Sequence, residues 1–281
     1  MSLPDYAELL CCSNFTFLRG ASHAEELVLR AQAMGYTALA VTDECSMAGI
    51  AQAHVAAKKH GLPLIVGSQF RVQAGEGPTG NFTLLLLATS LHGYGNLCEL
   101  ITRLRRSSDK GTYRLRLGDV NPAVLADCLA IAVPPRGATQ GQRHATAHWL
   151  LGAFLGRCWL GVTQLGRLDD AIHLHRLREA GALTAVPLVA VGDVHMHVRS
   201  RKPLQDVLTA IRIGRPLTAC GFALTPNAEQ HLRTRVRLAQ CFPPDLLRET
   251  LVVAQRCDGW SLDELRYQYP AEVVPEGRTP A

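Results

Sequence analysis

Short apolar runs recur along this chain and are separated by longer stretches whose apolar residues repeat with a helical period. Runs of this kind, bounded by Gly, Pro and polar residues, are typical of buried β-strands. The pattern predicts seven strands, at Glu8–Cys11, Ala38–Val41, Leu64–Val66, Thr83–Ala88, Cys128–Val133, Cys158–Val162 and Pro187–Val191.

A helix is predicted between the first two strands. Leu27 and Ala31 fall on one helical face, and Gly35 supplies a stop. Ser22 followed by Glu25 predicts a capping box at the start of this helix. Strand, helix and strand in this order form a βαβ unit, so we expect the strands to be parallel.

A second βαβ unit follows directly. Its helix is predicted over Ala48–His60, with Gly61 as the C-terminal breaker before the next buried strand. Further helices are predicted at Tyr94–Arg105, Ala145–Leu155, Leu168–Ala180, Leu204–Ile213 and Pro244–Cys257. Such repeated alternation produces either an open sheet or a closed barrel, and we expect the barrel.

The length of the chain limits the number of domains. A single α/β barrel commonly takes about 200–250 residues, so 281 residues fit one large domain and a short appendage. We place the barrel in residues 1–240. Residues 241–281 are predicted to form a helical and then extended connector, whose Tyr, Pro and Glu-rich end resembles a linker.

Composition narrows the class of protein. Apolar residues make up 47% of the chain and charged residues 19%, and no apolar run approaches the ~18 residues of a membrane span. The N-terminus lacks the basic and apolar pattern of a secretory signal, so we expect a soluble protein in the cytoplasm, with no membrane partner. The nine cysteines are odd in number and include no CxxC pair, which favours reduced thiols over disulfides or a zinc knuckle.

Polar residues that follow the predicted strands are the candidates for chemistry, because reactive groups of parallel α/β folds lie at the carboxyl ends of strands. These residues are Cys11, Cys12, Ser13, Asn14, Thr42, Asp43, Glu44, Ser68, Gln69, Asp193, His195 and His197. Asp193 and His195 lie two apart on an extended segment and face the same way, so this pair could bind a metal.

The set is nevertheless poor for a metal-dependent phosphoesterase, which needs about three protein ligands for each ion. Asp43 has an equally good interpretation as a turn or capping carboxylate. Glu44 is explained by the N-terminus of the following helix, and His195 and His197 by ordinary hydrogen bonding.

The net charge of +5 permits contact with nucleic acid without requiring it. A basic run (Arg103, Arg105, Arg106, Lys110, Arg114 and Arg116) suits phosphate contacts, although solvated helix ends and loops explain it as well. The sequence has no phosphate-binding loop, nucleophile elbow or dinucleotide fingerprint, which excludes those enzyme classes.

Several segments carry a family resemblance. Residues 6–22 (YAELLCCSNFTFLRGAS), Ala40–Gly49, Leu64–Phe70, Gly93–Cys98, Gly192–Arg201, Cys220–Leu224 and Ser261–Tyr267 resemble, in this order, the N-terminal region of bacterial error-prone DNA polymerases of the C family. These are relatives of the DNA polymerase III α subunit, and the resemblance spans nearly the whole chain.

The resemblance implies a PHP domain with a distorted (β/α)7 barrel, placed ahead of a palm that holds the polymerase active site. PHP domains with an intact metal centre carry His-x-His, Asp-His, Glu and Asp-x-His at four strand ends. The matching positions here are Leu10, Cys12, Asp43, Glu44, Gln69, Asp193 and His195.

Leu10 offers no donor atom and Gln69 no charge, so this resemblance implies a degenerate cleft without a metal. Cys12, Asp43, Asp193 and His195 are the residual candidates for one zinc ion. We expect neither a catalytic residue nor a cofactor in the chain itself.

The family also implies what the longer protein does, namely error-prone DNA synthesis in damage-induced mutagenesis and translesion synthesis. Its palm would need magnesium, and its partners would be the remaining polymerase modules, the primer-template, a sliding clamp and mutagenesis accessory proteins. The alternative is a free-standing PHP phosphoesterase or exonuclease.

Overall fold

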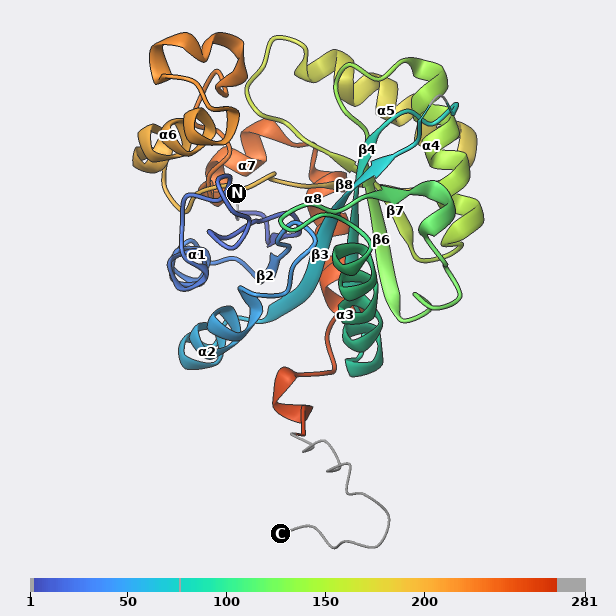
Figure 1. Cartoon of the computed structure of the whole chain (residues 1–281), viewed down its shortest axis with the longest axis horizontal. Helices are drawn as coiled ribbons and strands as arrows, with labels where there is room; N and C mark the ends of the chain where they lie inside the picture. Colours follow the sequence, from blue (N-terminus) through green and yellow to red (C-terminus); the bar gives the residue numbers. More distant parts are fainter. Residues whose placement is uncertain (1–2, 76, 267–281) are drawn as a thin grey trace, which may run out of the picture.

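A curled β-sheet with helices around it forms the core of this computed structural model, which describes residues 3–75 and 77–266 (Figure 1). The strands are β1 (Ala7–Glu8), β2 (Ala38–Val41), β3 (Leu64–Gln73), β4 (Phe82–Ala88), β5 (Leu115–Arg116), β6 (Cys128–Val133), β7 (Cys158–Val162) and β8 (Leu188–Ala190). The helices are α1 (Ala24–Ala33), α2 (Ile50–His60), α3 (Leu91–Arg106), α4 (Gln140–Ala153), α5 (Asp170–Thr184), α6 (Lys202–Ile213), α7 (Arg235–Cys241) and α8 (Pro244–Arg256).

Strand direction follows the connections between strands. The order across the sheet is β1-β2-β3-β4-β6-β7-β8, and all neighbours are parallel except at β4, which is antiparallel to both β3 and β6. The expectation of parallel strands is therefore wrong at β4. The described residues between β3 and β4 include no helix, and so short a connection can only return the chain in the opposite direction.

The two ends of the sheet meet and close the barrel. The Cys12 N–H donates to the Val194 carbonyl (2.9 Å), and the Val194 N–H donates to the Leu10 carbonyl (2.8 Å). Helix α8 packs against both β8 and β1, and the Thr250 hydroxyl accepts a hydrogen bond from the Ala7 N–H (3.2 Å). The predicted distorted barrel is confirmed, and α8 covers the gap between its end strands.

Apolar side chains fill both sides of the sheet. Leu9, Ile65, Leu85, Ile131 and Val189 belong to one buried cluster, to which nearly every strand contributes. Two larger clusters lie between the sheet and the surrounding helices. Because the strands are buried on both faces, they appear in the sequence as continuous apolar runs instead of alternating ones.

The start of α1 differs from the prediction. The N-cap is His23, whose N–H donates to Glu26 Oε2 (2.9 Å), so the capping box is displaced by one residue from Ser22 and Glu25. The Ser22 hydroxyl instead lies 2.8 Å from His197 Nδ1 and accepts a hydrogen bond from the His197 N–H (2.9 Å). Ser22 therefore joins two loops at the end of the barrel.

The C-terminal part of the described chain continues the fold past residue 240. Leu246, Leu247 and Val253 of α8 are buried, and Trp159 Nε1 donates to Glu249 Oε1 (2.6 Å). The division at residue 240 remains a prediction, and residues 267–281 of the predicted connector lie outside the described residues. Among the helices described, none has the length and apolar character needed to cross a bilayer.

Candidate functional site: a cleft at the barrel mouth

A cleft of about 630 Å³ opens where the parallel strands end. Three of the predicted site residues line it, namely Leu10, Gln69 and Asp193. Three arginines line it as well, namely Arg71 of β3 and the loop residues Arg136 and Arg167. Strand ends far apart in the sequence therefore meet at one mouth, as the fold requires.

Asp43 lies beside this cleft, and its carboxylate accepts hydrogen bonds from one backbone N–H and two side-chain hydroxyls. Oδ1 accepts hydrogen bonds from the Ser13 N–H (2.8 Å) and the Thr16 hydroxyl (2.6 Å), and Oδ2 accepts one from the Ser13 hydroxyl (2.8 Å). Burial raises the pKa of Asp43, while these hydrogen bonds act to lower it. A Cβ on Gly49 would lie 2.5 Å from Oδ2, so the packing leaves little room for a metal ion on that side.

Cys12 is buried next to Asp43. Burial raises the pKa of its thiol well above the usual range, and the negative charges of Asp43 and Asp193 raise it further. The metal ligand is the thiolate, and these surroundings keep the thiol protonated. Its neighbour Leu10 contributes only an apolar side chain to the cleft wall.

Asp193 and His195 are held together, as the spacing predicts. His195 Nε2 lies 3.3 Å from Asp193 Oδ1, and Gln230 Nε2 donates to Asp193 Oδ2 (2.6 Å). Burial acts to raise the pKa of Asp193, but His195 and Gln230 outweigh it and lower the pKa overall. Asp193 also has a φ of 50°, a left-handed conformation that Asp tolerates better than most residues.

Glu44 and Gln69 are occupied by protein partners. Glu44 lies 3.2 Å from both Arg19 Nε and Arg71 Nε, and it accepts a hydrogen bond from the Tyr113 hydroxyl (2.9 Å). Gln69 Nε2 donates to the Thr42 carbonyl (2.9 Å). The interpretation of Glu44 as a partner for the next helix is wrong, because its partners come from other parts of the chain.

Sequence reasoning missed Glu8, a buried carboxylate at the closure of the barrel. Its Oε1 accepts hydrogen bonds from the N–H groups of Leu10 (3.0 Å) and Gly192 (2.8 Å), and Oε2 accepts one from the Tyr6 hydroxyl (2.9 Å). Burial raises the pKa of Glu8, and these donors act to lower it. A charged residue inside an apolar strand was the available signal.

The donors around the cleft do not fit a metal centre. Within residues 3–75 and 77–266, no three His, Cys, Asp or Glu side chains form a group that could hold an ion. The residual zinc candidates (Cys12, Asp43, Asp193 and His195) are thus not assembled into one ligand set, and no chemical step can be derived through a metal here.

Comparison with known proteins agrees with this fold. Residues 8–133 match the family model of the PHP domain. A putative metal-dependent phosphoesterase from Bifidobacterium adolescentis superposes with a TM-score of 0.52 at 15% identity, covering 68% of this chain and 89% of its own. An amidohydrolase from Chromobacterium violaceum gives a TM-score of 0.54 at 15% identity, covering 68% and 88%. The chain is a PHP domain built on a distorted barrel.

Curated relatives match this chain over nearly its full length. Error-prone DNA polymerases from Dechloromonas aromatica and Burkholderia mallei are each 51% identical, over 100% and 99% of this chain, but over only 27% of their own length. A third, from Methylococcus capsulatus, is 50% identical over 98% of the chain. The chain belongs to the N-terminal PHP region of the error-prone DNA polymerases, and it spans about a quarter of their length.

Proposed function

We propose that this chain is the N-terminal PHP module of an error-prone DNA-directed DNA polymerase, a nucleotidyltransferase for damage-induced mutagenesis and translesion synthesis. Within that enzyme the module is structural and holds no active site. The polymerase assignment is supported by a relative that is 51% identical over the whole chain, and the structural role by Asp43, whose carboxylate accepts three hydrogen bonds from Ser13 and Thr16. A buried carboxylate held by three hydrogen bonds stabilises the mouth of the barrel.

The alternative, a free-standing PHP phosphoesterase or exonuclease, is not favoured. Such an enzyme needs several ligands to hold its ions and to generate a hydroxide. Leu10 and Gln69 supply no charged donor to the cleft, and the Cys12 thiol is buried and protonated. The relatives that match the whole chain are polymerases.

Metal content and hydrolysis together test this choice. The purified chain is incubated with Mn²⁺ or Zn²⁺ and desalted, and the bound metal and the hydrolysis of bis(p-nitrophenyl) phosphate and end-labelled DNA are measured. We expect substoichiometric metal and no hydrolysis above the buffer rate. More than one equivalent of bound metal together with phosphodiester hydrolysis would overturn the structural role.

The other half of the proposal concerns the longer polymerase. We infer that its palm takes magnesium, and that the remaining modules, the primer-template, a sliding clamp and mutagenesis accessory proteins are its partners, in the cytoplasm. Primer extension past an abasic site, with and without Mg²⁺, tests it on the polymerase that carries this chain at its N-terminus. A polymerase without lesion bypass would contradict it.

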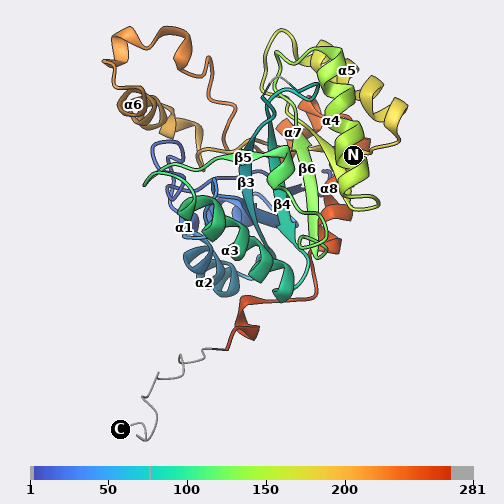
Figure 2. The same cartoon turned by 45° about the vertical axis from the view of Figure 1, so that its right-hand side comes forward.

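The outer face of α6 supports contact with the remaining modules. Leu204, Val207 and Ile211 are exposed along one side of this helix (40%, 43% and 59%), whereas Gln205 and Thr209 are buried. Figure 2 shows α6 and the segment that follows it standing out from the barrel. An apolar face turned outward from a helix whose buried side is partly polar is typical of a surface covered in a larger assembly.

A further inference from the structure

Residues 103–119 concentrate most of the net charge of the chain. This basic segment runs from the end of α3 through β5 and holds six Arg or Lys residues against two Asp residues. Its net charge is therefore +4, compared with +5 for all 281 residues. Such a local excess of cations attracts polyanions.

Five of the six cations face solvent. These are Arg103, Arg106, Lys110, Arg114 and Arg116. The ion pairs that the structure describes use other arginines and lysines, so no described carboxylate neutralises these five side chains. Four of these cations, all except Lys110, line two adjoining grooves of about 550 Å³ each, which share Ser107, Ser108 and Arg114.

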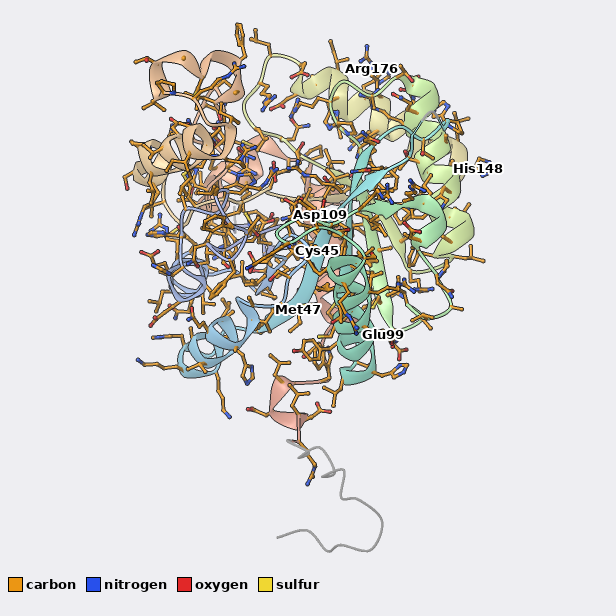
Figure 3. The ribbon with its side chains drawn as sticks, viewed as in Figure 1. Cys45, Met47, Glu99, Asp109, His148 and Arg176 are labelled. Atoms are coloured by element: carbon orange, nitrogen blue, oxygen red, sulfur yellow. The ribbon has the colours of Figure 1, made fainter. Side chains whose placement is uncertain are left out.

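The sixth cation, Arg105, fixes the segment to the barrel. Its guanidinium donates to the carbonyls of Cys45 (3.2 Å), Glu44 (3.3 Å) and Thr112 (3.3 Å), and it lies 5.3 Å from the centroid of the Tyr113 ring. Figure 3 labels Asp109, in the turn of the segment, and Cys45, whose carbonyl accepts the hydrogen bond from Arg105. The exposed cations thus project from a firmly held loop, which reduces the entropy lost on binding.

We propose that the basic segment binds the phosphate backbone of duplex DNA without reading its sequence. A protein partner is less suitable, because no large hydrophobic side chain within the described part of this segment is among the exposed ones, and protein interfaces depend on buried apolar or aromatic anchors. Single strands are also less suitable. Tyr113 packs on Phe70 (ring centroids 6.5 Å apart) and is not free to stack on bases.

The inference rests on the proposed function only for the choice of DNA as the natural polyanion. Each phosphate contact contributes about −0.9 to the slope of log K against log salt, so five contacts predict a slope of about −4.5. Binding should be independent of sequence.

The test measures fluorescence anisotropy of a labelled DNA duplex with the full 281-residue chain across a salt series. The triple variant Arg106→Gln, Lys110→Gln and Arg114→Gln should reduce the slope by about 3 and weaken binding about tenfold or more at low salt. The control triple variant, Lys59→Gln, Arg176→Gln and Arg248→Gln, makes the same change in net charge at exposed sites on α2, α5 and α8. Arg176 lies well away from Asp109 in Figure 3.

We expect the control variant to keep the wild-type slope, and thermal unfolding should show both variants folded. Equal weakening by the two triple variants, no effect of the first, or tighter binding of poly-glutamate or of single-stranded DNA than of the duplex would each overturn the inference. If duplex binding behaves as expected while the polymerase lacks lesion bypass, the proposed function fails and this inference stands.

Discussion

Glu8 and Gly192 depend on each other at the closure of the barrel. The Gly192 N–H donates to Glu8 Oε1, and a Cβ on residue 192 would lie 2.0 Å from Glu8 Oε2. The glycine is required here for space, because the buried carboxylate occupies the volume that a side chain would need. The consequence is measurable in stability.

Gly192→Ala should lower the free energy of unfolding by about 2–3 kcal/mol, because either Glu8 or the backbone must move. Urea unfolding checks this change. Gly152→Ala is the matched control, since nothing lies within 4 Å of the added Cβ in α4 and alanine favours a helix. We expect the control to be neutral or slightly stabilising, and an equal loss in both variants would contradict the explanation.

His173 is a buried imidazole of α5 for which no hydrogen-bond partner is found among the described residues. Burial, together with the charges of Arg136 and Arg143, lowers its pKa to about 4. Between pH 6.5 and about 4, His173 is protonated in the unfolded chain but stays neutral in the folded one. Stability contributed by this group is therefore complete above pH 6.5 and is lost as the pH falls toward 4.

His173→Leu should remove this pH dependence, which amounts to at most about 1.4 kcal/mol per pH unit and about 3 kcal/mol in total. Unfolding free energies at pH 4.5, 5.5 and 7 give the slope, and the difference from wild type isolates this one residue. His175→Leu, at an exposed site two residues further along α5, should keep the wild-type slope. If His173→Leu kept the wild-type dependence of unfolding free energy on pH, His173 would not be the source of that dependence.

At the scale of elements, α8 is part of the barrel's packing. Val253 is fully buried while its neighbour Val252 is 44% exposed, so one helix offers a matched pair of valines. Val253→Ala should cost about 2–3 kcal/mol, counting the lost methyl groups and the cavity. Val252→Ala should stay within about 0.5 kcal/mol of wild type. Thermal unfolding of both variants decides whether α8 stabilises the closure.

Strands with an uninterrupted apolar run could be predicted from the sequence. Short elements that form only through contacts with distant residues could not. Cys128–Val133 and Cys158–Val162 match the predicted strands residue for residue. Strand β5 has two residues and exists only because Leu115 pairs with Val72, while α7 is too short for a helical period to appear. The antiparallel direction of β4 depends on the missing crossover.

The same limit applies to the cleft. The ends of the predicted strands located Gln69 and Asp193, and the family resemblance located Leu10; all three line one mouth because the fold brings these positions together. The partners of Asp43 and Glu44 could not be read from spacing, since Thr16, Arg19 and Tyr113 come from loops whose paths are set by tertiary packing. Glu8 differs, because its charge inside an apolar run was a visible signal, while its partners Tyr6 and Gly192 were not.

At the scale of the whole molecule, a basic surface and an exposed apolar surface lie in different places. The basic segment lies beside β3, and the apolar face of α6 stands on a separate projection (Figures 1 and 2). Two surfaces of different chemistry suit two kinds of partner, DNA at the first and other parts of the same polymerase at the second.

The triple variant Leu204→Gln, Val207→Gln and Ile211→Gln tests whether the outer face of α6 is covered in the full polymerase. In the 281-residue chain it should change the free energy of unfolding by less than about 1 kcal/mol, because these side chains are exposed. In the full polymerase it should lower the unfolding temperature clearly, since the same side chains would be buried against other modules. The control, Leu29→Gln, Val55→Gln and Leu183→Gln, alters exposed residues elsewhere. Equal shifts for both sets in the full polymerase would contradict the assignment.

The closure between β1 and β8 also determines where the barrel opens locally. Residues 82–88 of β4 are paired with six residues on each neighbouring strand, whereas the junction near Cys12 and Val194 has two backbone hydrogen bonds, the Glu8 hydrogen bond to the Gly192 N–H and the cover of α8. Local opening follows the seam that breaks the fewest bonds. Solvent should therefore reach the interior between β1 and β8 more readily than beside β4, and a partner bound across this junction would slow its local opening.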